Sequence, residues 1–234
     1  MINSKYFFKG FKSIKGLDSP ALALGASFIA IGALLKNIGF NLEQSIFSTF
    51  LTYALPGSLV MAESFLIGAS LINIFLAVWL VNTRLYPMTV SLMPLLLHKS
   101  QPRWKYYPSC HFIAVSAWLI MKSNYETIEK KDRVDFWIGI GSATWSVAVV
   151  STILGFYLSD YLNKDMLMGL AILNPIYFTC MLVGAMKTIQ VSLSVILGGI
   201  LGPFFYFFSP EWSILLGGLI GGSAAYLIGE KNVN

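Results

Sequence analysis

Residues 70 to 97 read SLINIFLAVWLVNTRLYPMTVSLMPLLL, and this stretch decides what kind of fold the chain can adopt. Its only charged residue is Arg84, and it exceeds the roughly 20 apolar residues that a helix needs to cross a bilayer. Similar apolar runs fill the rest of the chain, which is 56% hydrophobic and 12% charged over 234 residues. A soluble domain needs more polar residues to cover its core. The sequence therefore predicts an all-α, polytopic transmembrane helical bundle.

Roughly eight hydrophobic segments can be delimited by charge or by proline and glycine. They are residues 18 to 36, 45 to 68, 70 to 97, 108 to 122, 135 to 159, 166 to 186, 188 to 208 and 212 to 229. Two of them are unusual. Segment 45 to 68 is interrupted by Pro56 and Gly57, and segment 108 to 122 is short and contains Ser109, His111 and Ser116.

The distribution of Lys and Arg selects a topology, because short loops rich in these residues stay in the cytosol. If all eight segments cross, the basic loop around residues 99 to 105 falls outside while the basic N-terminus is inside. If the two unusual segments are broken or re-entrant, every Lys and Arg except Lys36, Lys164 and Arg84 is cytosolic. We therefore expect six full spans plus two broken or re-entrant segments, with both termini in the cytosol. Seven or eight full spans is the alternative.

No soluble domain boundary is visible, because no loop exceeds about fifteen residues. Residues 1 to 17 contain four lysines without a continuous apolar run, which predicts a cytosolic or interfacial leader. Residues 18 to 229 form the predicted transmembrane transport domain, and residues 230 to 234 form a cytosolic tail.

Several functional classes find no support in the sequence. The net charge is +5, and the Lys and Arg residues that produce it lie mainly between apolar segments. This distribution indicates membrane topology and not nucleic-acid binding. The two cysteines and two histidines do not have the spacing of a disulfide framework or a metal site. Phosphate-binding loops, nucleophile elbows and other catalytic motifs are also missing. We expect neither an enzyme nor a bound cofactor.

Arg84 is the clearest functional candidate, because a charge at bilayer depth is costly unless it faces a cavity or a partner. On an unbroken helix, Asn73 and Ser91 share its face and form one polar stripe. Asn82 projects to the opposite face, although Pro87 can kink the segment and change this geometry.

Glu63 is the natural counter-ion of Arg84 in this sequence. A fixed Glu63–Arg84 ion pair that holds two helices together is one interpretation. The other makes Arg84 the receptor for a substrate carboxylate and Glu63 a proton-coupling group. The sequence leaves both open.

Pro56 and Gly57 interrupt backbone hydrogen bonding where lipid cannot replace it. Transporters use such broken helices to bind charged substrates, and Ser58 would lie in the first turn after the break. An ordinary proline kink is the alternative. Asn174, before Pro175, marks a second and weaker break.

His111 is a candidate proton-coupling residue because the reference pKa of histidine is near neutrality, with a satisfied interfacial histidine as the alternative. In the last two segments, Gly198 and Gly202, Gly217 and Gly221, and Gly218 and Gly222 have GxxxG spacing, which favours close helix packing. Packing within the chain is the first interpretation, and docking of another subunit is the second.

The chain resembles the AzlC family, the large subunits of bacterial branched-chain amino-acid exporters. The likeness rests on VNTRLYPMTVSLMP at residues 81 to 94, ALPGSLVMAE at 54 to 63, IGIGSATW and NPIYF, and it extends from about Gly16 to Tyr226. Its most specific element is Asn82-x-Arg84. Where the family usually has Ala-Gly-Ala-Ser-Gln, this chain has Pro56 to Val60, and Leu85 replaces the usual histidine. An acidic pair frequent in the family is replaced around His111.

The resemblance implies a location in the bacterial inner membrane and a small partner subunit of the AzlD type. It also implies export of a small zwitterionic solute, with branched-chain amino acids as the expected substrate and a proton gradient as the driving force. The expected substrate-binding residues are Pro56, Gly57, Ser58, Asn73, Asn82, Arg84 and Asn174, and the expected proton-coupling residues are Glu63 and His111. A membrane scaffold that does not transport, or a permease for another small organic solute, is the alternative.

Overall fold

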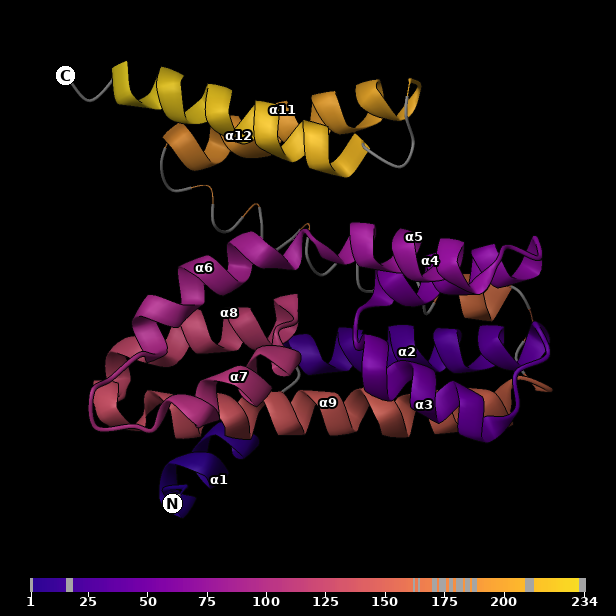
Figure 1. Ribbon diagram of the computed structural model, residues 1–234, viewed down its shortest axis with the longest axis horizontal. Helices are drawn as coiled ribbons and strands as arrows, with labels where there is room; N and C mark the ends of the chain where they lie inside the picture. The colour runs from indigo at the N-terminus through magenta and orange to yellow at the C-terminus, as the bar shows by residue number, and fades with distance from the viewer. Residues whose placement is uncertain are drawn as a thin grey trace. The chain divides into compact units, whose positions relative to one another are not determined.

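The structure is a computed structural model that describes residues 2–15, 19–161, 163, 165–169, 172, 176, 179, 183, 186, 189–208 and 213–231. The chain consists of two compact units, Met1–Asn174 and Pro175–Asn234. Every regular element among the described residues is helical, in agreement with the predicted fold class (Figure 1).

The helices of the first unit are α1 Ser4–Lys12, α2 Pro20–Asn37, α3 Leu42–Thr52, α4 Leu55–Leu66, α5 Leu71–Asn82, α6 Leu85–Leu96, α7 Tyr106–Ser109, α8 Val115–Asn124 and α9 Arg133–Leu158. Short 3-10 turns are η1 Arg103–Lys105, η2 Cys110–Phe112, η3 Tyr125–Thr127 and η4 Lys130–Asp132. The helices of the second unit are α11 Ile189–Tyr206 and α12 Ser213–Lys231.

Helices α2 and α9 lie side by side in the first unit and run in the same direction (Figure 1). Gly25 of α2 lies against Ser151 of α9, and Gly32 lies against Phe156 further along both helices. A Cβ atom on Gly32 would collide with the carbonyl oxygen of Thr152. The two backbones therefore approach each other at a distance that only a residue without a side chain allows.

Ion pairs distinguish the two ends of the α2–α9 pair. At the C-terminal ends of both helices, Nζ of Lys36 in the last turn of α2 lies 2.7 Å from Oδ2 of Asp160, which follows α9. At the start of α9, Lys105 Nζ lies 2.8 Å from Asp135 Oδ1, and these side chains are only 1% and 0% exposed. Buried charges of this kind require a partner, so this pair fixes η1 to the start of α9. We refer to the Lys36 end and the Asp135 end of the helix pair.

Helix α1 packs across α9 at the Asp135 end. Gly10 of α1 and Gly139 of α9 each lie directly against the backbone of the other helix. The backbone N–H of Asn3 donates to Asp135 Oδ2 at 3.0 Å. The expected leader is therefore an element packed onto the helical bundle, held by glycine contacts and by the buried carboxylate of Asp135.

Helices α3 and α4 form an antiparallel turn that we call hairpin A (residues 42–66). Helix α3 leaves the Lys36 end along α9, where the hydroxyls of Thr49 and Thr152 are 2.9 Å apart. It ends at Tyr53, which adopts the left-handed conformation with φ 36°. The Tyr53 ring stacks on Phe28 at the middle of α2, with 6.4 Å between ring centroids.

Helix α4 returns to the Lys36 end. Phe65, near its C-terminus, packs edge-on against Phe40, which follows α2, with 4.9 Å between ring centroids. Hairpin A thus begins and ends at the same end of the α2–α9 pair, and its tip is halfway along α2. The chain breaks at Tyr53 and Ala54, so the expected break at Pro56 and Gly57 is displaced by about one helical turn.

Helices α5 and α6 replace the unbroken helix expected for residues 70 to 97, and they meet at an angle of 50°. Pro87 explains the break, because it lacks the N–H that would bond the carbonyl of Thr83 and its ring crowds that carbonyl. The carbonyl oxygen of Thr83 accepts instead from the backbone N–H of Tyr86 at 3.0 Å, and the Thr83 hydroxyl donates to the carbonyl oxygen of Leu80 at 2.6 Å. At its far end α6 reaches the Asp135 end, where Arg133 donates to the carbonyl oxygen of Leu95 at 3.2 Å.

Residues 103–124 form a second hairpin, hairpin B, which starts from the Asp135 end. It follows α9 inward, with Trp137 Nε1 donating to the carbonyl oxygen of Ser109 at 3.1 Å and Phe112 packed on Gly141. The chain turns at extended Ile113 and Ala114. Helix α8 then returns to the Asp135 end.

A contact of Tyr125, the residue after α8, shows that α8 ends near the start of α9. The guanidinium of Arg133, the first residue of α9, lies 5.3 Å from the ring centroid of Tyr125. Hairpins A and B therefore pack on the α2–α9 pair from opposite ends. Whether segments 45 to 68 and 108 to 122 cross the membrane stays a prediction.

The described residues contain three helical stretches long and apolar enough to cross a membrane, Pro20–Asn37, Lys130–Leu158 and Ile189–Tyr206. The bent α5–α6 pair makes a fourth if it counts as one span. Most of segment 166 to 186 lies outside the described residues, and the apolar part of α12 is the shorter Leu216–Ile228. Six full spans therefore stays a prediction.

The second unit is an antiparallel pair of helices that meet through glycines. Gly217 of α12 faces Gly202 of α11, and Gly221 faces Gly198. Two of the three predicted GxxxG motifs thus pack on each other within the chain.

We predict that Gly155→Ala destabilises the protein, because the added Cβ would collide with the carbonyl oxygen of Ile29 in α2. Overpacking against backbone costs about 1–3 kcal/mol. Gly199→Ala is the control, because a Cβ at Gly199 meets no atom within 4 Å. Thermal unfolding of the purified protein should show a lower midpoint for Gly155→Ala alone. Equal midpoints for the two variants would contradict the close α2–α9 contact.

Candidate functional site

The tips of hairpins A and B lie together at the middle of the first unit. Tyr53 and Ala114, one from each tip, belong to one buried cluster around Phe28. His111 Nε2 lies 2.9 Å from the carbonyl oxygen of Phe50, which joins hairpin B to hairpin A directly. The backbone is therefore broken at two neighbouring places inside the bundle.

The start of α4 contains three of the predicted site residues. Pro56 is at the second position of the helix, where its missing N–H leaves no bond unmade. Ala54 before the helix is extended, and no side chain caps the first turn. Ser58 lies at the end of this turn, as predicted, and it is 0% exposed with no hydrogen-bond partner for its hydroxyl.

Asn82 lies directly against this helix start. An added Cβ on Gly57 would be 2.8 Å from Asn82 Nδ2 and 3.0 Å from its Oδ1. Asn82 Oδ1 is itself buried without a hydrogen-bond partner. The structure thus brings Asn82 against Gly57, the neighbour of Ser58, although Asn82 is distant from both in the sequence.

Arg84 occupies the break between α5 and α6, two residues after Asn82. Leu85 and Met88, in the first turn of α6, pack against the hydrophobic core. This packing holds the start of α6 inward, and Arg84 Nε is buried without a partner.

The predicted polar stripe of Asn73, Arg84 and Ser91 is wrong, because it assumed one continuous helix. Asn73 is exposed in the first turn of α5, about 14 Å along the helix from Asn82. Ser91 is exposed on α6, where its hydroxyl accepts a hydrogen bond from Trp118 Nε1 at 3.1 Å. The 50° bend separates these residues from the site.

Glu63 does not form the fixed ion pair with Arg84 that was one of the two interpretations. The ion pairs among the described residues are Lys36–Asp160, Lys105–Asp135 and Lys131–Glu129. Glu63 is exposed in the second half of α4. Glu63 is connected to Gly57 and Ser58 only through α4, the helix that contains all three residues.

His111 sits at the hairpin contact, deeper along α9 than the basic loop beside which the sequence places it. Its ring lies among Phe50, Tyr53 and Phe112, with centroid separations of 6.4, 6.3 and 6.1 Å. Asn174 lies outside the described residues.

Ser116 was noted in the sequence but not selected as a site residue. It is in the first turn of α8, 1% exposed, and its hydroxyl has no hydrogen-bond partner. The sequence contains one feature that could have identified Ser116. In both short helical segments a serine closely follows an alanine, with Ser58 after Ala54 and Ser116 after Ala114.

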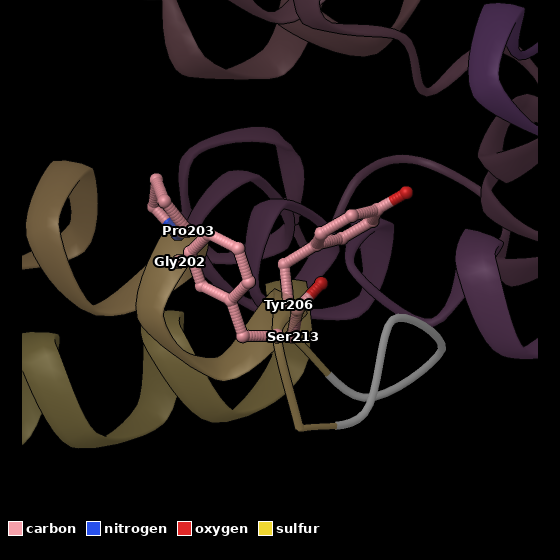
Figure 2. Close-up of a pocket in the computed structure, with 5 residues that line it drawn as sticks. Gly202, Pro203, Tyr206 and Ser213 are labelled. Atoms are coloured by element: carbon pink, nitrogen blue, oxygen red, sulfur yellow. The ribbon is translucent and has the colours of Figure 1, made fainter.

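A separate hollow lies in the second unit, at the end of α11 (Figure 2). It is lined by Gly202, Pro203, Tyr206, Phe207 and Ser213. None of these lining residues is charged, and none is a predicted site residue. The predicted site residues are instead in the first unit.

Broken helices that meet inside an apolar bundle, with buried polar groups around the breaks, are typical of membrane transport proteins. The sequence profile of the family described as AzlC protein matches residues 20–162. The chain belongs to the AzlC family, whose members are membrane transport proteins of the branched-chain amino-acid exporter type and not enzymes. No curated protein and no solved structure gives a significant match.

We predict that Gly57→Ala destabilises the start of α4 by about 1–3 kcal/mol, because the new Cβ would press on Asn82. Shortening the neighbour in the double variant Gly57→Ala/Asn82→Ser should recover part of this loss. Thermal unfolding of the wild type, both single variants and the double variant measures the coupling. Strictly additive effects would show that Gly57 and Asn82 are not in contact.

Proposed function

We propose that the chain exports small zwitterionic solutes, with branched-chain amino acids as its substrates. The observation on which the proposal depends is the group of buried polar atoms without partners at the helix breaks, namely Ser58 Oγ, Asn82 Oδ1 and Arg84 Nε. A buried polar group left unpaired costs about 1–3 kcal/mol, so a ligand that pairs with these atoms is stabilised.

The chemistry of these groups matches the two ends of an amino acid. The Arg84 guanidinium and the N–H groups at the start of α4 are donors and favour a carboxylate. The amide oxygen of Asn82 can accept a hydrogen bond from an ammonium group. The apolar cluster beside the hairpin tips, which includes Phe28, Tyr53 and Ala114, suits a branched aliphatic side chain.

Proton coupling is assigned to Glu63, with His111 as a second titratable group at the hairpin contact. Glu63 belongs to α4, so a change in its charge acts on the helix whose N-terminus forms the site. A static scaffold is less well supported, because a structural Arg84 needs an anionic partner and Glu63 does not provide one.

The proposal places the protein in the bacterial cytoplasmic membrane with both termini in the cytosol. The Asp135 end, with Lys130, Lys131 and Arg133, then faces the cytosol, in accordance with the positive-inside rule. A small subunit of the AzlD type is its proposed partner.

We predict that Arg84→Gln reduces leucine and valine efflux at least tenfold, because a charge-assisted hydrogen bond contributes about 1.5–3 kcal/mol. Arg103→Gln, at an exposed arginine of η1, should have no effect. Efflux of radiolabelled leucine from loaded proteoliposomes, with and without the small subunit, gives the measurement. Unchanged efflux by correctly folded Arg84→Gln protein would exclude Arg84 from the site.

We predict that Glu63→Gln removes the acceleration of efflux by an imposed proton gradient and leaves gradient-free exchange of leucine intact. Glu43→Gln, at an exposed carboxylate in the first turn of α3, is the matched control. The readout is the ratio of efflux rates with and without the pH difference. A ratio that stays at the wild-type value in Glu63→Gln argues against Glu63 as the coupling group.

A further inference from the structure

Hairpin B brings a second uncapped helix N-terminus to the middle of the first unit. Ala114, before α8, is extended with φ −137° and ψ 155°, and Ala54, before α4, is extended with φ −144° and ψ 116°. Neither helix has a side-chain cap. The first-turn N–H groups of both helices therefore lack the partner that a Ser, Asp or Asn cap usually supplies.

The two helix starts are neighbours, and their dipoles oppose each other. Helix α4 runs from the hairpin tips to the Lys36 end, and α8 runs from the tips to the Asp135 end, so both N-termini are in the middle. Tyr53 and Ala114 share one cluster, and the Tyr53 ring centroid is 6.3 Å from that of His111. Each N-terminus has a partial positive charge of about half an elementary charge, and a shared anion would offset both.

Two buried serines provide an independent indication of a ligand. The hydroxyls of Ser58 and Ser116 are both buried without a hydrogen-bond partner, one in the first turn of each helix. Cα–Cβ bonds tilt toward a helix N-terminus, so both hydroxyls project toward the hairpin tips. Ser48 of hairpin A shows the contrast, because its buried hydroxyl donates to the carbonyl oxygen of Ser45 at 3.1 Å.

We infer that Ser116 and the N-terminus of α8 form the second half of the solute site and bind the substrate carboxylate opposite Ser58 and the N-terminus of α4. This inference rests on the proposed function. A carboxylate has about four acceptor positions, so donors from both hairpins and Arg84 can share it. Because the hairpins come from opposite ends of the α2–α9 pair, the bound carboxylate joins two elements that are separate in the sequence and meet only at their tips.

The test is ligand-dependent thermal stabilisation of the purified protein. The probes are leucine, 4-methylpentanoate (the carboxylate without the amine), leucinol (the amine without the carboxylate) and chloride. The variants are Ser116→Ala, Ser116→Thr, which keeps the hydroxyl, and Ser48→Ala as the control. Ser116→Ala should weaken binding of leucine and 4-methylpentanoate about tenfold and leave leucinol unchanged. Ser116→Thr and Ser48→Ala should bind both carboxylates as the wild type does.

The outcomes separate this inference from the proposed function. Wild-type export of leucine together with unchanged carboxylate binding by Ser116→Ala overturns the inference and leaves the function standing. No export of any amino acid, with 4-methylpentanoate binding that still depends on Ser116, overturns the function and supports the carboxylate site. Stabilisation by chloride as strong as that by 4-methylpentanoate identifies an inorganic anion site and overturns the inference, as does the absence of stabilisation by either carboxylate.

Discussion

The close parallel contact between α2 and α9 is the constraint on which the first unit depends. Glycines at positions 32 and 155 let the two backbones meet, and both hairpins pack along this pair. In an apolar surrounding, a helix can be interrupted only where protein, water or a ligand takes over its hydrogen bonds. The α2–α9 pair supplies that protein surface, which is why the chain can break at the tips of both hairpins.

The breaks place the backbone N–H groups of two helix starts inside the bundle. Helix starts that point into the bundle expose N–H groups and a positive dipole end. At Ala54 and Ala114 no side chain neutralises these ends, and the serines of the first turns are also unpaired. An unpaired buried group is costly, so its presence at several adjacent positions favours an anionic ligand over a purely structural role.

Buried charged groups are paired at the Asp135 end of the helix pair, whereas Arg84 at the centre is not paired with Glu63. Lys105 and Asp135 are almost fully buried and paired, and the same carboxylate accepts a hydrogen bond from Asn3 in α1. This network fixes α1 and η1 to α9. Arg84 has no such partner in Glu63, and its Nε is buried without a hydrogen-bond partner. The buried ion pair and the proposed solute site therefore involve different residues.

The sequence by itself determined the class of fold, because composition and segment length depend only on solvation in lipid or water. It also indicated that segments 45 to 68 and 108 to 122 are broken and that Arg84 is buried, because helix-breaking residues and isolated charges are local signals. Their positions were less well predicted. Tyr53 in a left-handed conformation moved the first break away from Pro56 and Gly57, and the loss of a backbone bond at Pro87 divided the polar stripe of Asn73, Arg84 and Ser91.

Only the tertiary structure decided which of these groups meet. The contact of Asn82 with Gly57, the hydrogen bond from His111 to Phe50 and the missing Glu63–Arg84 pair all depend on how separate helices pack. Ser116 belongs to the proposed site only because the tip of hairpin B lies beside that of hairpin A. The distances between these groups depend on how closely the helices pack at their glycines. A periodic pattern along one segment does not show which other segment packs against it.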